Sequence, residues 1–253
     1  MPRRGERKRK RQDEGETEKE KKKEKEINEN VGKKIRVGII GCGRMGKIHA
    51  LNAFQHPETE VVGIFTRSGR DPSVAESAKP HHNDSALFDT PRYPLQLPAT
   101  IPHHDMEAFS QFLSRKELDG VVVAAPTDTL ASLVLQCVSA GVPVMVEKPL
   151  AFEPQVIREI HQAASEASVP VLCAYQRRFD SAFSAVRDSV KAGRIGAPQL
   201  LLLTSRDHPP PSTSNLAGGG SFYADFSAHD VDTAVFLLGE RPKRVFATGA
   251  LDT

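Results

Sequence analysis

Short runs of apolar, mostly β-branched residues alternate with amphipathic stretches from Ile35 to Ala192. Such runs predict strands buried on both faces, and apolar residues at helical spacing between them predict covering helices. We expect strands at 35–40, 61–65, 121–125, 142–147 and 169–175, and helices at 45–54, 129–140, 154–167 and 180–192. Because the two kinds of element alternate, the pattern predicts an α/β fold with a parallel sheet.

A segment at 68–105 interrupts this alternation. It is rich in proline, histidine, asparagine and aspartate, and it is longer than most loops. We expect an inserted surface segment that holds at most one short strand. Its histidine pairs, at 81–82 and 103–104, could bind a metal, but paired histidines in a polar loop are usually solvated, and we expect that here.

The pattern changes again after Ala197. Residues 197–206 and 242–250 read as strands, and 221–239 read as a helix behind a loop rich in proline and glycine. We expect these residues to form an incomplete α+β open-sheet domain over 181–253. The first domain then covers 35–180.

Charge is concentrated in the first 34 residues, which hold 14 basic and 9 acidic side chains and few apolar ones. We expect a disordered or solvated tail. Its basic run at 7–11 could instead act in nuclear import or contact an anionic surface. The remaining 219 residues carry a net charge of −3, which does not favour nucleic-acid binding.

The three cysteines, Cys42, Cys137 and Cys173, are widely spaced and odd in number. This argues for a reducing compartment and against a disulfide or zinc framework. The sequence has neither an apolar run long enough for a membrane span nor a secretory leader. We therefore expect a cytoplasmic protein with no membrane partner.

A glycine-rich turn follows the first predicted strand. Gly41, Gly43 and Gly46 have the spacing G-x-G-x-x-G and lead into a predicted helix. In this context the first glycine permits a tight turn, the second lets a pyrophosphate approach the backbone, and the third allows close packing. The sequence therefore predicts a dinucleotide site that also includes Cys42, Arg44 and Met45.

The end of the second predicted strand bears on the choice of cofactor. An acidic residue is expected there to bind a ribose 2′-hydroxyl, but the chain has Thr66, Arg67 and Ser68. A guanidinium and two hydroxyls suit a 2′-phosphate, so we favour NADP over NAD. Alternatively, Arg67 points into water and the protein uses either cofactor.

Four further motifs follow in order: AAPTDT at 124–129, VEKPL at 146–150, AYQRRFD at 174–180 and GGGSFYADFSAHDVD at 218–232. With the glycine turn, they resemble the Gfo/Idh/MocA oxidoreductase family, nearest to its inositol 2-dehydrogenase branch. The resemblance implies a Rossmann NAD(P)-binding domain followed by a substrate and oligomerisation domain. It adds to the cofactor site Ala125, Pro126, Thr127, Glu147 and Lys148.

The resemblance also implies catalytic residues. Lys148 corresponds to the lysine beside the nicotinamide and substrate, and Asp225 and His229 correspond to the family's dyad. Residues four apart share a helix face, so Asp225 could orient the imidazole. Histidine would carry the hydroxyl proton and Lys148 would stabilise the charge on the oxygen. Asp207, in the proline-rich loop, is a further candidate for substrate binding.

For a few other residues we expect a structural role or no role in metal binding. We expect Arg177 and Arg178 to fix the domain junction or bind phosphate. No second histidine lies at metal spacing from His229, so we expect no metal. Leu130 stands where family members commonly carry a histidine.

The family's second domain continues beyond the length present here, so we expect a truncated sheet and a homo-oligomer only if that sheet were complete. The functional prediction is an NAD(P)-dependent oxidoreductase that acts on a secondary alcohol of a cyclitol, sugar or polyol. The alternative is a non-catalytic NAD(P) sensor or interaction protein.

Overall fold

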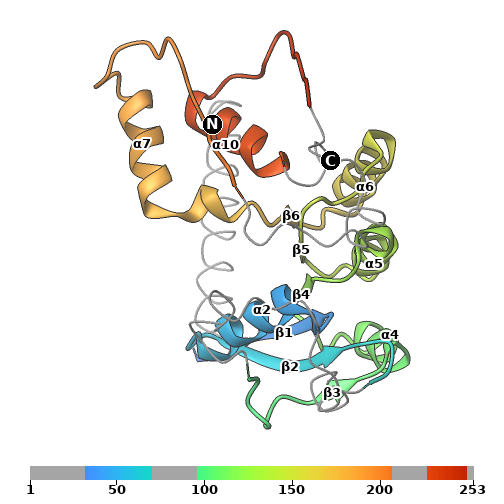
Figure 1. The fold of residues 1–253 in the computed structure, drawn as a ribbon. Coiled ribbons are helices and arrows are strands. Elements are labelled where there is room, and N and C mark those ends of the chain that lie inside the picture. The colour runs from blue at the N-terminus through green and yellow to red at the C-terminus, as the bar shows by residue number, and fades with distance from the viewer. Residues whose placement is uncertain (1–31, 70–95, 207–226, 250–253) are drawn as a thin grey trace, which may run out of the picture.

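The computed structural model describes residues 32–69, 96–206 and 227–249. Its centre is a six-stranded parallel sheet with the strand order β3-β2-β1-β4-β5-β6 (Figure 1). The strands are β1 (Ile35–Ile40), β2 (Thr59–Phe65), β3 (His103–His104), β4 (Gly120–Val123), β5 (Val144–Val146) and β6 (Val171–Cys173). This order is that of the doubly wound dinucleotide-binding fold. Strands β1 to β3 are added toward one edge of the sheet, and β4 to β6 are added toward the other, so the order of strands reverses between β1 and β4.

Helices cover both faces of the sheet. Helix α2 (Arg44–Gln55) packs on one face, and α4 (Met106–Ser114), α5 (Thr127–Ser139) and α6 (Pro154–Ala167) cover the other (Figure 1). Adjacent strand residues point to opposite faces, so Ile39 packs in the cluster under α2 while Ile40 packs in the cluster under α4, α5 and α6. The unbroken apolar runs in the sequence arise because both faces are buried.

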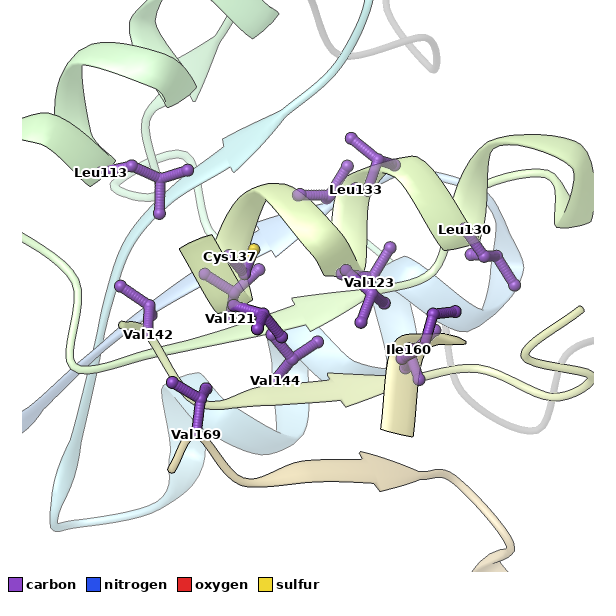
Figure 2. Close-up of a cluster of buried hydrophobic side chains, with 14 of the residues drawn as sticks. Leu113, Val121, Val123, Leu130, Leu133, Cys137, Val142, Val144, Ile160 and Val169 are labelled. Atoms are coloured by element: carbon purple, nitrogen blue, oxygen red, sulfur yellow. The ribbon is translucent and has the colours of Figure 1, made fainter. Parts of the chain in front are cut away.

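The larger core cluster lies between β4, β5 and the helices α5 and α6 (Figure 2). Val123, Val134, Val146 and Ile160 are fully buried there. At about 25 cal/mol per Å² of apolar surface removed from water, this packing supplies most of the free energy that favours folding.

The chain beyond β6 forms a separate group of helices. The 3₁₀ helix η1 (Gln176–Phe179) leads into α7 (Ser181–Lys191), and both contact α10 (Ala228–Leu238). These helices lie beyond the β6 edge of the sheet (Figure 1). The Asp180 carboxylate caps α7 by accepting hydrogen bonds from the backbone N–H groups of Ala182 and Phe183.

Most of the predicted elements are confirmed, with boundaries that differ by no more than two residues. The prediction of α6 at 154–167 is exact, and the short strand expected within the inserted segment is β3. Helix α4 was not predicted, although Asp105 is a typical N-cap residue and its carboxylate accepts a hydrogen bond from the Ala108 N–H at 2.8 Å.

The two strands predicted after Ala197 are wrong for the described residues, since neither 197–206 nor 242–249 forms a strand. Leu200, Leu202, Val245 and Phe246 are each more than 80% exposed. Their alternating pattern fits a strand, but a strand also needs a hydrogen-bonded neighbour, and no described strand pairs with either segment. The incomplete open sheet expected over 181–253 is therefore not formed by the described part of that range.

We expect Ile160→Ala to lower the free energy of unfolding by about 2–5 kcal/mol, because it leaves a cavity among fully buried neighbours. Val186→Ala, on the exposed side of α7, is the control and should change it by no more than about 0.5 kcal/mol. Urea unfolding followed by circular dichroism measures both. Equal losses in the two variants would contradict the assignment of the core.

Candidate functional site

The glycine turn lies at the carboxyl edge of the sheet, where β1 ends. Gly41 has φ = +99°, and a Cβ atom there would overlap the Ala124 carbonyl oxygen. A Cβ on Gly46 would overlap the Gly41 carbonyl oxygen, whereas one on Gly43 would meet only open space. The first and third glycines thus permit close backbone packing, and the second leaves room for a ligand, as the spacing predicted.

Helix α2 begins directly behind this turn. Its N-cap residue is Gly43, which provides no side-chain cap. The first N–H groups of the helix and its positive dipole end are therefore available to an anion. This is the arrangement that binds a pyrophosphate in dinucleotide-binding folds.

A cavity of about 890 Å³ adjoins the turn. Nine of the predicted cofactor residues line it: Gly41, Cys42, Gly43, Arg44, Thr66, Arg67, Ser68, Ala125 and Pro126. The others, Met45, Gly46, Thr127, Glu147 and Lys148, are not among the lining residues. Sequence reasoning missed Lys47, Thr129 and Ser132, which also line it and bring a further cation and two hydroxyls.

The charge of the cavity wall is entirely positive. Arg44, Lys47 and Arg67 line it, and no aspartate or glutamate is among the described lining residues. Thr66, Arg67 and Ser68 follow β2 directly, and the Thr66 N–H donates to the His104 carbonyl at 2.9 Å. The cavity thus suits a ligand with several phosphate groups.

Glu147 and Lys148 follow β5 at the same edge of the sheet. The Glu147 N–H donates to the Val123 carbonyl at 2.9 Å, which fixes the start of this segment. The Glu147 carboxylate lies 2.7 Å from Nε2 of His49, on α2, and also accepts a hydrogen bond from the Lys148 N–H at 3.2 Å. Sequence reasoning did not single out His49, although its place one turn after the last glycine put it beside the motif.

His229 lies in the first turn of α10. Burial and the nearby cations of Lys148 and Arg177 lower its pKa, so its imidazole is neutral at pH 7. Lys148 thus lies near enough to His229 for its charge to act on the imidazole. Within the described residues, Nδ1 of His229 is buried and has no hydrogen-bond partner. A neutral imidazole beside a cation can accept a proton while the cation stabilises a developing oxyanion.

Tyr175 and two arginines hold α10 against η1. The rings of Tyr175 and His229 meet edge to face, with centroids 6.0 Å apart. Arg177 donates to Asp230 at 2.7 Å, and Arg178 binds both carboxylate oxygens of Asp232. The expectation that the arginines fix the junction is confirmed for these contacts.

Asp230 is a carboxylate next to the candidate histidine. Burial alone would raise its pKa, but hydrogen bonds from Arg177 and Ser205 lower it. Asp230 therefore stays ionised and keeps the first turn of α10 attached to η1 and to Ser205.

Some predicted residues lie elsewhere or outside the described ranges. Asp207, Asp225 and the histidines at 81–82 fall outside them. The expectation that His104 is solvated is wrong, because its ring stacks on Phe65 with centroids 5.3 Å apart. Leu130 is a core residue of α5, 1% exposed.

No three His, Cys, Asp or Glu residues within the described ranges are grouped so that they could hold a metal ion. None of the helices described is long and apolar enough to cross a membrane.

We expect Lys148→Gln to raise the pKa of His229, because it removes a cation that disfavours the imidazolium. Lys116→Gln, which removes an exposed cation just after α4, is the control and should leave this pKa unchanged. An NMR titration of the His229 ring protons measures both. An unchanged or lower pKa in Lys148→Gln would contradict the proximity of the two side chains.

Comparison with solved structures supports the fold. A crystal structure of a Sinorhizobium meliloti 1021 protein superposes with a TM-score of 0.68 at 27% identity and covers 82% of this chain and 56% of that one. A myo-inositol dehydrogenase from Corynebacterium glutamicum ATCC 13032 superposes with a TM-score of 0.61 at 26% identity over 81% of this chain and 55% of that one.

Curated relatives match a similar share of the chain at a similar sequence identity. The chain is 29% identical over 217 residues to the inositol 2-dehydrogenase of Rhizobium meliloti (strain 1021), which covers 86% of this chain and 59% of the relative. The myo-inositol 2-dehydrogenase of Thermotoga maritima is also 29% identical, with the same coverage. The chain thus spans a little under three fifths of the length of these relatives.

Two family models match consecutive parts of the chain. The model of the oxidoreductase family with an NAD-binding Rossmann fold matches residues 35–175, and the Gfo/Idh/MocA C-terminal domain model matches residues 183–253. Since the first match alone covers more than half of the sequence, the chain belongs to the Gfo/Idh/MocA oxidoreductase family.

Proposed function

We propose that this chain acts in an NAD(P)-dependent dehydrogenase that oxidises a secondary alcohol of a cyclitol, sugar or related polyol, or reduces the corresponding ketone. The observation that carries the proposal is the placement of two side chains at the edge of the sheet that also bears the glycine turn. Lys148 follows β5, and the ring of His229 meets that of Tyr175, which follows the neighbouring strand β6. A bound nicotinamide would supply the hydride acceptor for the oxidation.

The two side chains have complementary tasks in this proposal. The neutral imidazole of His229 accepts the hydroxyl proton as the carbon loses hydride. The Lys148 cation stabilises the negative charge that develops on the same oxygen. Asp225 would orient the imidazole from the preceding turn, and Asp207 would contact other hydroxyls of the substrate.

The cofactor half of the proposal rests on the positive cavity. The pyrophosphate would lie at Gly43 and the first N–H groups of α2, where a side chain would otherwise intrude. The remaining predicted contacts would come from Ala125, Pro126, Thr127 and Glu147. Thr66, Arg67 and Ser68 would hold a 2′-phosphate, which favours NADP over NAD.

The substrate class follows from the names of the curated relatives, which include inositol 2-dehydrogenases and a myo-inositol dehydrogenase of Streptomyces leeuwenhoekii. We assign residues 35–180 to cofactor binding and residues 181–253 to substrate binding and subunit contacts. The ranges of the two matching family models support that division. We place the protein in the cytoplasm.

We expect Arg67→Ala to weaken NADPH binding by about tenfold or more and to leave NADH binding nearly unchanged, because only NADPH carries the phosphate that Arg67 would bind. Arg115→Ala, an exposed arginine after α4, is the control and should affect neither ligand. Titration of nicotinamide fluorescence measures the dissociation constants of NADPH and NADH for the parent protein and both variants. Equal affinity of the parent protein for NADPH and NADH would remove the NADP assignment.

We expect His229→Gln to lower kcat for polyol oxidation by about 10²- to 10⁴-fold, the range for loss of a general base. His161→Gln, on the exposed face of α6, should leave kcat unchanged. The assay follows the absorbance of reduced nicotinamide with myo-inositol and other polyols. Tight cofactor binding without turnover of any polyol would contradict the dehydrogenase and favour a cofactor-binding sensor.

A further inference from the structure

The contact between His49 and Glu147 joins two parts of the site that the chain supplies separately. His49 belongs to α2, whose first turn lines the cavity, and Glu147 immediately precedes Lys148. Nε2 of His49 donates to Oε1 of Glu147 at 2.7 Å. Both side chains are largely buried, with exposed fractions of 16% and 14%, so this hydrogen bond is shielded from competing water.

The Glu147 carboxylate is held on both of its oxygens. Oε1 contacts His49, and Oε2 accepts the backbone N–H of Lys148 at 3.2 Å. The carboxylate therefore connects α2 to the backbone of the residue that carries the candidate catalytic ammonium. Its own backbone N–H is bonded to Val123 at the end of β4, so the side chain starts from a fixed point.

We propose that His49 is a positioning residue that sets the place of Lys148 relative to the nucleotide-binding end of α2. This inference rests on the proposed function for the role of Lys148. Helix α2 is one rigid element, so an imidazole one turn beyond Gly46 keeps a fixed distance from the phosphate-binding turn. Through its contact with Glu147, His49 therefore fixes the position of the segment after β5 relative to the phosphate-binding turn.

The consequence for catalysis is specific. Loss of the contact leaves the glycine turn and the cavity wall intact, so cofactor affinity should change little. Lys148 would lose one of the contacts that define its backbone position, and a displacement of about 1 Å at a catalytic group can cost about 10²-fold in rate. We therefore expect an effect on kcat with little effect on the KM for cofactor.

The experiment compares His49→Leu with His49→Gln. The glutamine Nε2 can donate to Glu147 much as the imidazole Nε2 does, whereas leucine cannot. Limited acetylation followed by peptide mass spectrometry gives the rate of modification of Lys148 relative to exposed Lys116. This rate requires no turnover, so it tests His49 even if the dehydrogenase proposal fails. Polyol oxidation by the same variants then gives kcat and KM.

In His49→Leu we expect the relative acetylation rate of Lys148 to rise about two- to tenfold, the population change that follows loss of one net hydrogen bond. His49→Gln should remain near the parent value. No change in His49→Leu, or equal changes in both variants, would overturn the proposal. If thermal unfolding shows that His49→Leu does not fold, His49→Asn replaces it, since its shorter amide does not reach Glu147.

Discussion

Two backbone segments approach each other at the carboxyl edge of the sheet, and the site is built around that approach. The turn after β1 can pass the end of β4 only because Gly41 has no side chain to meet the Ala124 carbonyl. Gly46 also lacks a side chain, which would meet the Gly41 carbonyl, and this lets α2 begin immediately behind the turn. The parallel pairing of β1 with β4 then brings the segments after both strands to one edge. A larger residue at Gly41 would displace α2 and, with it, the cavity wall and His49.

Charge divides this edge into two regions. The cavity wall is cationic and has no carboxylate among its described lining residues, which suits phosphates. Toward β6, cations and carboxylates are paired, and Arg177 with Asp230 anchors the helix that carries His229. Lys148 lies near enough to depress the pKa of His229 and so keeps it in the proton-accepting form. In the proposed function, nucleotide binding and proton transfer would therefore fall to neighbouring groups with different electrostatic surroundings.

The sequence predicted those parts of the fold that depend on local pattern. Buried apolar runs, amphipathic helices and glycine spacing are all local, and the Rossmann sheet and the phosphate turn followed from them. Contacts between residues far apart in the sequence could not be predicted in this way. The pairing of His49 with Glu147 joins residues 98 positions apart, and no spacing rule connects them. The strands predicted after Ala197 were wrong because apolar alternation does not reveal whether a partner strand is present. Asp225 was identified from the family resemblance and lies outside the described residues, so its role stays a prediction.

The central claim is that the glycine turn and the Lys148–His229 pair serve one hydride transfer. The most direct test incubates the protein with NADP⁺ and a polyol deuterated on its carbinol carbons, and then analyses the nicotinamide by mass spectrometry. The account predicts deuterium on the reduced ring, and transfer that is about 10²- to 10⁴-fold slower when His229 is replaced by glutamine. Saturating cofactor binding with no deuterium transferred from any polyol would contradict it.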